Sequence, residues 1–400
     1  MTYGLILGLG AAAIAAAALT RSVPLMVAAV TALIVALLVE AGRRRALHGV
    51  SVRRTVSRRV VSWGGEVEVI TEVRNGKWLP LPWLRVSDRW PPAVEPLDTD
   101  DATRSPSGRT VRQSFSLRWQ ETVRRRVRAR CLRRGLQRFG PVELVAGDPL
   151  GFTETSLEVP AGERLIVLPK VLRPAGLRLP MSLLPGEIDR RLSPAVDAAR
   201  LAGVRPYRRG DPARAINWRA TARRRALHVS EFEPAAESPV LLLLDLRTSA
   251  HVVGGFDAQL FEVLIVTAAS LATALDGAGC SVGLLSNAQT AGSRAPLELE
   301  PEPEGLPALL TTLGSIAVSP ARVFEPLLAA EVRAPRPMVG YVVVTSRLSP
   351  TSVLLLARLR RQAPLSVVFV GEPPAGGRRE VDLYLPGGFD WEHEDVLALA

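Results

Sequence analysis

The chain has 400 residues, 47% of them hydrophobic, and a formal net charge of +11 at pH 7. Such a length provides for two or three domains with cores of their own and excludes a single small module. The two cysteines, Cys131 and Cys280, stand in separate segments and exclude a disulfide framework.

Two uncharged apolar runs, residues 3–20 and 23–39, open the chain. Each approaches the length of about 20 apolar residues that a helix needs to cross a bilayer. Residues 1–42 are therefore predicted to form a transmembrane helical hairpin. A cleaved signal peptide would need a basic start, which the first four residues lack. A buried hairpin of a soluble protein is the other alternative.

Positive charge flanks the second run and predicts how the hairpin is oriented. Arg43, Arg44 and Arg45 follow the run directly, whereas the turn before it holds only Arg21. Arginine clusters next to a membrane helix are retained on the cytoplasmic side. We therefore expect a multi-pass protein of the cell membrane whose body is cytoplasmic.

Residues 43–171 alternate apolar and polar side chains over short runs, among them 67–73, 83–88 and 123–131. This period of two, with turn residues between the runs, predicts a β-rich, sandwich-like domain next to the membrane. Residues 98–108 lack large apolar side chains and are expected to form a flexible loop.

The excess positive charge lies in the same region, because residues 41–135 hold 22 Lys and Arg against 9 Asp and Glu. Three interpretations stay open: attraction to an anionic lipid leaflet, nucleic-acid binding through residues 43–135, or a solvated face of strands. We favour the first and the third over nucleic-acid binding.

Residues 172–204 are punctuated by prolines and are predicted to be a connector, and residues 205–238 form a dense segment of charges and aromatics. Asp211 is placed to cap a helix that begins at Pro212, and Ile216 and Trp218 are predicted to be buried. We favour a structural joint between domains over catalysis, because no nucleophile stands beside a base.

A hydrolase is the alternative for this segment. In it, Asp211 and Glu231 would act as paired carboxylates, assisted by Asn217 or His228.

Residues 239–400 alternate between apolar strands and amphipathic helices, which predicts a doubly wound α/β domain. The predicted strands are 240–244, 280–287, 338–346, 365–371 and 381–385, and the predicted helices are 256–279, 307–318 and 349–362.

Oxygen-bearing side chains follow two of these strands at the edge where ligands bind in such sheets. Asp245, Ser249 and Thr345 make a degenerate candidate for a metal site, since hard cations such as Mg²⁺ take oxygen ligands. The four histidines are scattered, so no histidine-based metal site is expected.

In the dense segment the chain resembles bacterial domain-of-unknown-function family 58. Two upstream turns, Arg134-Gly135 and Gly140-Pro141, match the family, as does Asp148-Pro149 with Gly151. The matching residues of the signature are Tyr207, Gly210, Asp211, Arg214, Ile216, Trp218, Ala222 and Arg223, followed by Glu231, Glu233 and Asp245.

The resemblance covers most of the chain and implies a particular layout and partner. A membrane hairpin and a β-rich segment would precede a von Willebrand factor type A-like α/β domain. The expected function is that of a non-enzymatic scaffold working with a MoxR-type AAA+ ATPase in protein assembly or maturation, without a small-molecule substrate. The expected interaction residues are Tyr207, Gly210, Asp211, Arg214, Asn217, Trp218, Arg223 and Glu231.

One departure from the type A pattern concerns the metal. Domains of this type that bind a metal carry Asp-x-Ser-x-Ser at the strand end, and here Arg247 replaces the first serine. The later strand end, residues 344–347, offers no aspartate. We therefore expect a guanidinium beside Asp245 in the place of a cation, and no cofactor, with Mg²⁺ the single weak candidate.

Overall fold

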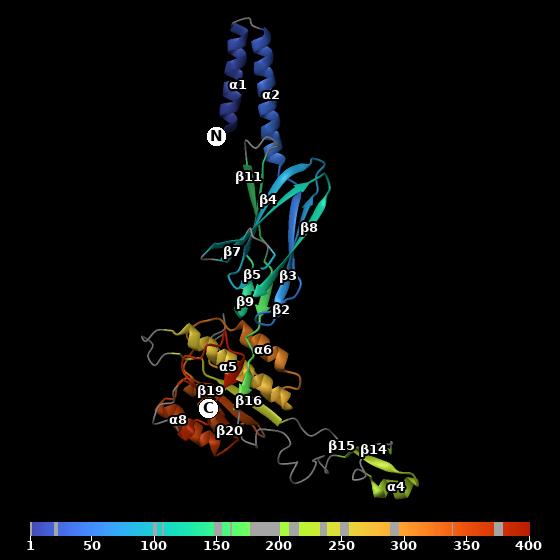
Figure 1. The fold of residues 1–400 in the computed structure, drawn as a ribbon, viewed down its shortest axis with the longest axis vertical. Coiled ribbons are helices and arrows are strands. Elements are labelled where there is room, and N and C mark those ends of the chain that lie inside the picture. The colour runs from blue at the N-terminus through green and yellow to red at the C-terminus, as the bar shows by residue number, and fades with distance from the viewer. Residues whose placement is uncertain are drawn as a thin grey trace. The chain divides into compact units, whose positions relative to one another are not determined.

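The computed structural model describes most of the chain, which divides into two compact units, Met1–Val167 and Leu168–Ala400 (Figure 1). The described residues are 2–19, 23–98, 102–105, 108–147, 154–160, 162–176, 201–207, 216–232, 238–248, 256–288, 296–337, 339–371 and 379–400.

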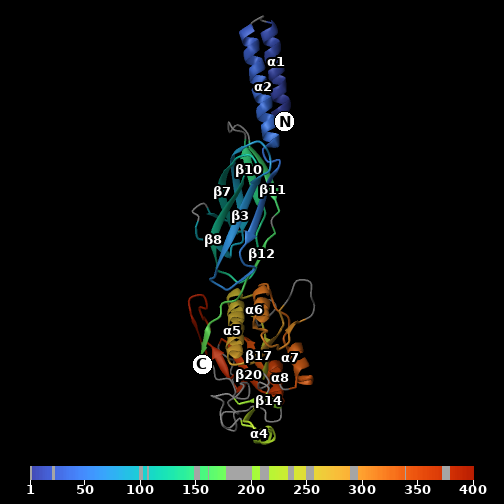
Figure 2. The same cartoon turned by 90° about the vertical axis from the view of Figure 1, so that its right-hand side faces the viewer.

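The first unit begins with two helices, α1 (Thr2–Leu19) and α2 (Val23–Arg45), which lie side by side (Figures 1 and 2). Gly10 lets them approach closely, because a Cβ at this position would meet Leu33 Cδ1 at 2.5 Å. Apolar side chains of α2 remain exposed, including Val27 at 60% and Ile34 at 51%. The predicted helices are present, and α2 continues past the apolar run into the arginines.

Two antiparallel sheets then pack face to face, and a short third sheet closes one side of them. The first sheet has the order β1 (Val50–Val56), β3 (Glu66–Asn75), β8 (Thr122–Cys131) and β5 (Val94–Pro96). The second has the order β11 (Glu154–Val159), β10 (Val142–Gly147), β4 (Leu81–Trp90), β7 (Gly108–Leu117) and β6 (Ala102–Ser105). The third contains β2 (Val60–Val61), β12 (Arg164–Val167) and β9 (Gly135–Arg138).

The alternation seen in the sequence corresponds to the inward face of the sandwich. Val73 on β3 shares one core with Leu84 on β4, Phe115 on β7 and Leu144 on β10. The prediction of a loop over residues 98–108 is wrong for residues 102–105, which form β6. Backbone pairing to β7 suffices to hold such an edge strand without apolar side chains.

A fully buried arginine lies between these sheets. Arg54 on β1 forms an ion pair with Asp88 on β4, and its Nε donates to Glu163 Oε2 at 3.0 Å. It also donates to the carbonyl oxygen of Gly140 at 3.0 Å, and its guanidinium stacks 4.8 Å from the centroid of the Phe139 ring. One side chain therefore ties three separate stretches of chain together.

The second unit is built on a six-stranded sheet with helices on its faces (Figure 2). Its order is β18 (Leu297–Leu299), β17 (Cys280–Ser286), β16 (Ser238–Leu244), β19 (Gly340–Thr345), β20 (Leu365–Val370) and β21 (Leu383–Leu385). All neighbours are parallel except β17 and β18. Counted in chain order, the strands run 3-2-1-4-5-6, which places the switch point between β16 and β19.

Four helices cover this sheet: α5 (Ala258–Gly277), α6 (Leu306–Ser315), α7 (Glu325–Arg333) and α8 (Pro350–Arg360). Leu328 of α7 and Leu356 of α8 share a core with Leu241 and Leu243 of β16. Helix α5 contacts β16, β17 and β19 and also packs on α6. Helix α7 and strand β18 were not predicted, because both are short.

Among the described residues, α5 is the helix long and apolar enough to cross a membrane. Of its most apolar 18-residue stretch, 67% is buried inside the protein, so its apolar character is explained by the core of the α/β unit. A shorter apolar helical stretch, Val23–Val35, lies within α2.

The start of the predicted connector belongs to the α/β unit. Strand β13 (Arg173–Ala175) pairs in parallel with β22 (Val396–Ala398), and the amide of Leu172 donates to Ser270 Oγ on α5 at 2.9 Å. Of the predicted connector, residues 172–175 therefore pack into the α/β unit and residues 201–204 belong to strand β14 (Leu201–Pro206), while 177–200 lie outside the described residues.

The dense segment forms a small lobe of its own. Strands β14 (Leu201–Pro206) and β15 (His228–Phe232) pair antiparallel, and α4 (Trp218–Arg224) lies between them in sequence. Asn217 caps α4, because its Oδ1 accepts from the amide of Ala220 at 2.9 Å. The predicted helix start at Asp211 and Pro212 lies outside the described residues.

Candidate functional site

Asp245 lies directly after β16, at the switch point of the sheet, and is fully buried. Three side chains donate hydrogen bonds to the Asp245 carboxylate. Arg247 donates from Nε to Oδ1 at 3.0 Å and from a terminal nitrogen to Oδ2 at 2.8 Å. Asn287 Nδ2 donates to Oδ1 at 2.7 Å, and Thr345 Oγ1 donates to Oδ2 at 3.0 Å.

The donors come from three neighbouring strand ends, which explains why they meet. Arg247 follows β16, Asn287 follows β17, and Thr345 ends β19. In a parallel sheet these ends lie at one edge. The sequence analysis singled out Asp245, Arg247 and Thr345 but missed Asn287, whose signal was a polar side chain directly after a buried strand.

The other end of Arg247 binds Glu325, the first residue of α7, with 2.8 Å between its terminal nitrogen and Oε2. Glu325 Oε1 accepts from the hydroxyls of Ser349 at 2.7 Å and Ser352 at 2.9 Å, both at the start of α8. The sequence analysis missed Glu325. An acidic residue followed by proline at a helix start was the available signal.

These contacts determine the charge states of the network. Burial opposes the charge of Arg247, but the hydrogen bonds from its guanidinium to Asp245 and the attraction of Asp245 and Glu325 raise its pKa. Burial also opposes ionisation of Glu325. Hydrogen bonds from Ser349, its own backbone amide and Ser352, together with Arg247, outweigh burial and lower the pKa of Glu325 to about 2.

The arrangement places a cation of the protein's own, the Arg247 guanidinium, beside the carboxylate of the candidate metal site. The guanidinium implied beside Asp245 is present and contacts both carboxylate oxygens. Of the other two candidate ligands, Thr345 donates its hydroxyl hydrogen to Asp245, and Ser249 lies outside the described residues. In the part of the chain that the structure describes, no three His, Cys, Asp or Glu side chains form a metal-binding group.

The low pKa of Glu325 makes the stability of the α/β unit depend on pH. A folded-state pKa of about 2 lies below the ordinary value of 4.5, so the stabilisation is complete above pH 4.5 and is lost as the pH falls towards 2. Because Glu325 keeps partial contact with solvent, we expect the loss to be about 2 kcal/mol or less. Urea unfolding of the wild type and of Glu325→Gln between pH 5 and 2 measures it, and the variant should lack this component.

Of the two signature residues predicted to be buried, Ile216 is partly buried and Trp218 is exposed. Trp218 is 69% exposed, so the prediction that it is buried is wrong. It is the first residue of a seven-residue helix that buries no side chain. Tyr207 and Leu227 are also exposed, and they are joined by the hydrogen bond from the Tyr207 amide to the Leu227 carbonyl oxygen at 2.9 Å.

The residues of the hydrolase alternative are only partly placed. Asn217 uses its side-chain oxygen to cap α4, and Glu231 is placed through backbone pairing to Gly203. Buried His228 lies within hydrogen-bonding distance of the Ala226 carbonyl oxygen, at 2.7 Å from Nδ1. Gly210, Asp211 and Arg214 lie outside the described residues, as does the turn at Asp148-Pro149 with Gly151. Arg223 is exposed on α4.

Several arginines of the β-rich unit pair with carboxylates on its surface. Arg124 binds Glu72 at 2.6 Å, and Arg128 binds Asp98 at 2.9 Å. Arg130 also pairs with a carboxylate, on the neighbouring strand β3. A face of mixed sign of this kind favours the solvated-strand interpretation over a phosphate-binding surface.

The upstream family turns also have structural explanations. The Gly140 carbonyl oxygen accepts from buried Arg54, and a Cβ at Gly140 would meet the Cβ of Arg89 at 2.9 Å. Gly135 adopts a φ of +124°, which side chains of L-residues rarely allow.

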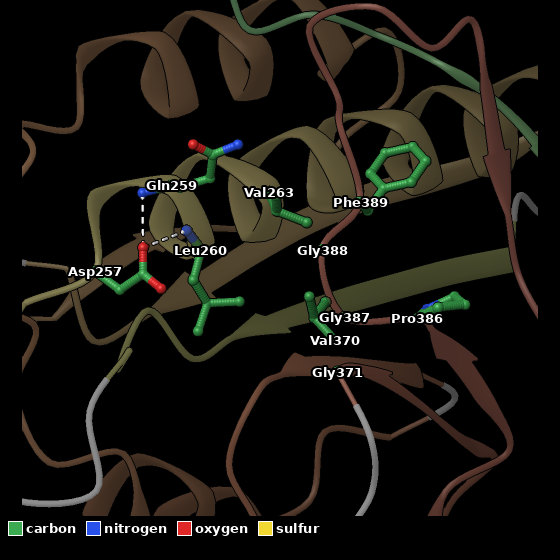
Figure 3. A pocket seen from close by; sticks show the side chains of 10 residues that line it. All are labelled: Asp257, Gln259, Leu260, Val263, Val370, Gly371, Pro386, Gly387, Gly388 and Phe389. Carbon is green, nitrogen blue, oxygen red and sulfur yellow. Dashed lines mark hydrogen bonds between the residues drawn. The ribbon is translucent and has the colours of Figure 1, made fainter.

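A pocket lies between the start of α5 and the ends of β20 and β21, with a volume of about 220 Å³ (Figure 3). Leu260, Val263 and Phe389 line it together with glycines 371, 387 and 388. Its carboxylate, Asp257, already accepts from the amides of Gln259 and Leu260 at 2.9 and 3.0 Å as the cap of α5. The lining therefore offers apolar surface and no free nucleophile.

Comparison with solved structures gives only distant likenesses. The CARDB domain of a Pyrococcus furiosus protein is 14% identical, with a match covering 30% of this chain and 91% of that domain at a TM-score of 0.21. A non-cellulosomal cohesin from Archaeoglobus fulgidus is 12% identical with the same coverage and TM-score. TM-scores of this size do not establish a shared fold.

Sequence comparison is more informative. The "Uncharacterized protein YeaD" of Bacillus subtilis (strain 168) is 24% identical over 245 residues, which is 60% of this chain and 56% of the relative. The chain thus spans little more than half the length of that relative. Residues 203–343, from the lobe to strand β19, match the family described as "Protein of unknown function DUF58". Residues 203–343 therefore form a DUF58 family segment, as the signature residues indicated.

Proposed function

We propose that this protein is a membrane-anchored, non-enzymatic scaffold that presents a von Willebrand factor type A-like α/β unit to a MoxR-type AAA+ ATPase. The observation that carries the proposal is that the Asp245 carboxylate already accepts hydrogen bonds from three side chains of the protein. The carboxylate at the ligand-binding edge of the sheet already holds Arg247, Asn287 and Thr345. A group so fully engaged is suited to holding a surface rigid rather than to exchanging protons with a substrate.

Anchoring is supported by the surface of the N-terminal helices. Helix α1 contains no charged residue, and α2 exposes Leu25, Val27 and Ile34. A contiguous exposed apolar surface on a soluble protein would be unfavourable, whereas lipid would bury it. The arginines after α2 support a cytoplasmic position for the body, because arginine clusters next to a membrane helix are retained on that side.

The type A-like assignment rests on strand order and on the position of Asp245. The order 3-2-1-4-5-6, with an aspartate at the end of the first strand and helices on both faces, is the arrangement that the family resemblance implies. The ion pair from Arg247 to Asp245 then replaces the cation, so partner binding would not depend on a metal.

The lobe is the proposed contact for the ATPase. It exposes Tyr207, Trp218 and Leu227 next to a series of arginines. Tryptophan, tyrosine and arginine dominate the binding energy of protein interfaces. The exposed arginines are Arg219, Arg223, Arg224 and Arg225.

Co-flotation tests this proposal directly. The full chain is reconstituted in lipid vesicles, washed with alkaline carbonate and floated with the purified MoxR-type ATPase. We expect the chain to stay with the vesicles, the ATPase to float only with the chain, and ATP hydrolysis to change on binding. Trp218→Ala should weaken ATPase binding by about 30-fold or more, the effect of losing a hot-spot tryptophan.

Leu354→Ala is the matched control, because Leu354 is an exposed apolar residue on α8, 53% accessible, outside the lobe. It should leave ATPase binding unchanged. An ATPase that neither floats with the chain nor changes its rate of hydrolysis would rule out the partnership, and binding that is insensitive to Trp218→Ala would rule out the lobe.

A further inference from the structure

Three loops meet where α2 enters the β-rich unit, and buried Asn75 holds two of them together. Asn75 is the last residue of β3 and is fully buried. Its side-chain Nδ2 donates to the carbonyl oxygens of Leu79 at 2.9 Å and Arg118 at 2.8 Å. Its backbone amide donates to the carbonyl oxygen of Glu121 at 2.9 Å. The β3–β4 loop and the β7–β8 turn are therefore fixed side by side.

A third connection joins these loops to the end of α2. The Gly76 amide donates to the Gly49 carbonyl oxygen at 2.8 Å, and Lys77 Nζ donates to the carbonyl oxygens of Arg45, at 3.0 Å, and Ala46. The ammonium group of Lys77 thus supplies hydrogen bonds to carbonyl oxygens at the carboxyl end of the helix. Ala46 and Leu47 are buried in the sandwich core, so the attachment is firm.

The rigid tips of these loops expose large apolar side chains. Trp78 is 76% exposed, Leu79 is 56% exposed, and Trp119 is 63% exposed. Arg45 and Arg118 are exposed beside them. Two exposed tryptophans on turns fixed by a buried asparagine do not serve the core, whose apolar residues lie on the strands.

We propose that Trp78, Leu79 and Trp119 form an interfacial docking surface that inserts into the headgroup layer of an anionic bilayer. The inference rests on the proposed membrane anchoring by α1 and α2. The apolar run of α2 ends at residue 39, and a helix rises about 1.5 Å per residue, so Arg45 lies about 9 Å beyond it. The headgroup layer of each leaflet is about 5–8 Å thick, so the end of the helix reaches its outer edge, and tryptophan is enriched at this membrane–water interface.

The neighbouring charges suit the same occupant. Arg45 and Arg118 would face lipid phosphates, each basic residue near an anionic surface contributing attraction. Trp83, half-buried at the start of β4, lies 5.9 Å from the guanidinium of Arg85. The docking surface would hold the β-rich unit against the membrane rather than let it swing on α2.

Fluorescence quenching by brominated lipids tests the proposal with the full chain. The chain is reconstituted in phosphatidylglycerol-containing vesicles whose acyl chains are brominated close to the headgroup. The helices α1 and α2 contain no tryptophan, so lipid quenching reports on the body. We expect the emission to fall by up to about two sevenths, the share of Trp78 and Trp119 among the seven tryptophans.

Trp78→Ser/Trp119→Ser should lose most of this quenching without a change in thermal unfolding midpoint, since both side chains are exposed. Trp218→Ser, which removes an exposed tryptophan of the lobe, should keep it. Quenching that persists in the double variant overturns the docking surface. So does an unquenched wild type whose Trp78 and Trp119 are shielded from aqueous acrylamide, because a second copy or another protein then covers them.

Carbonate washing and flotation separate this proposal from the anchoring on which it rests. A wild type that stays with the vesicles but shows no lipid quenching contradicts the docking surface alone. A wild type that carbonate removes from the vesicles contradicts the anchoring, and the docking surface with it.

Discussion

Replacing Arg54 with alanine is expected to lower the free energy of unfolding of the β-rich unit by about 3–5 kcal/mol, because it leaves buried Asp88 without its counter-ion. Arg54 has no solvent contact, and it binds Asp88, Glu163 and the Gly140 carbonyl oxygen at once. Its loss also leaves a cavity beside Phe139. Urea unfolding of the full chain in detergent micelles, followed by circular dichroism, measures the effect.

Two variants show whether the loss comes from the buried charge. Arg124→Ala removes a surface arginine that is 67% exposed and paired with Glu72, and we expect at most about 1 kcal/mol. Burial raises the pKa of Asp88 even though Arg54 and the Trp90 indole favour its ionised form. Arg54→Met/Asp88→Asn should therefore be less destabilised than the sum of the single variants. Equal losses for Arg54→Ala and Arg124→Ala would contradict the central role of Arg54.

Arg247→Ala is the second change with a large expected effect, a loss of about 3–5 kcal/mol from the α/β unit. The substitution strips the buried Asp245 carboxylate of its cation and removes one partner of Glu325. Asn287 and Thr345 still donate to Asp245, but neither brings a positive charge. Urea unfolding at neutral pH measures the loss.

Arg361→Ala, at an exposed arginine following α8, is the control and should stay within about 0.5 kcal/mol of the wild type. The double variant Arg247→Ala/Asp245→Asn should recover part of the loss, because the uncompensated charge is then absent. A double variant that loses the full sum of both single changes would mean that the two side chains do not act as a pair.

The elements of the α/β unit follow largely from local pattern. The strand predicted at 240–244 and the helix predicted at 256–279 correspond to β16 and α5. Continuous apolar runs and helical periodicity are visible without knowledge of contacts. Short elements such as β18 and α7 were not predicted, because segments of three and nine residues carry too little periodicity.

The roles of single side chains were harder to predict when they depended on distant partners. Arg54 belongs to a basic run that the sequence analysis treated as a surface, yet its partners lie 34 and 109 residues further along the chain. Trp218 was expected to be buried, yet the short helix that carries it buries none of its residues. Burial of one residue is decided by what packs over it, and pattern cannot supply that.

The site at Asp245 combines both kinds of information. The sequence by itself placed Asp245 at the end of the first strand, put an arginine two residues later and identified the family, because these are properties of neighbouring residues. Only the tertiary structure brought Asn287 and Glu325 to that arginine and carboxylate, from 42 and 78 residues away. Parallel strands converge at one edge whatever their separation in the chain, and this convergence turned a degenerate metal motif into an internal ion-pair network.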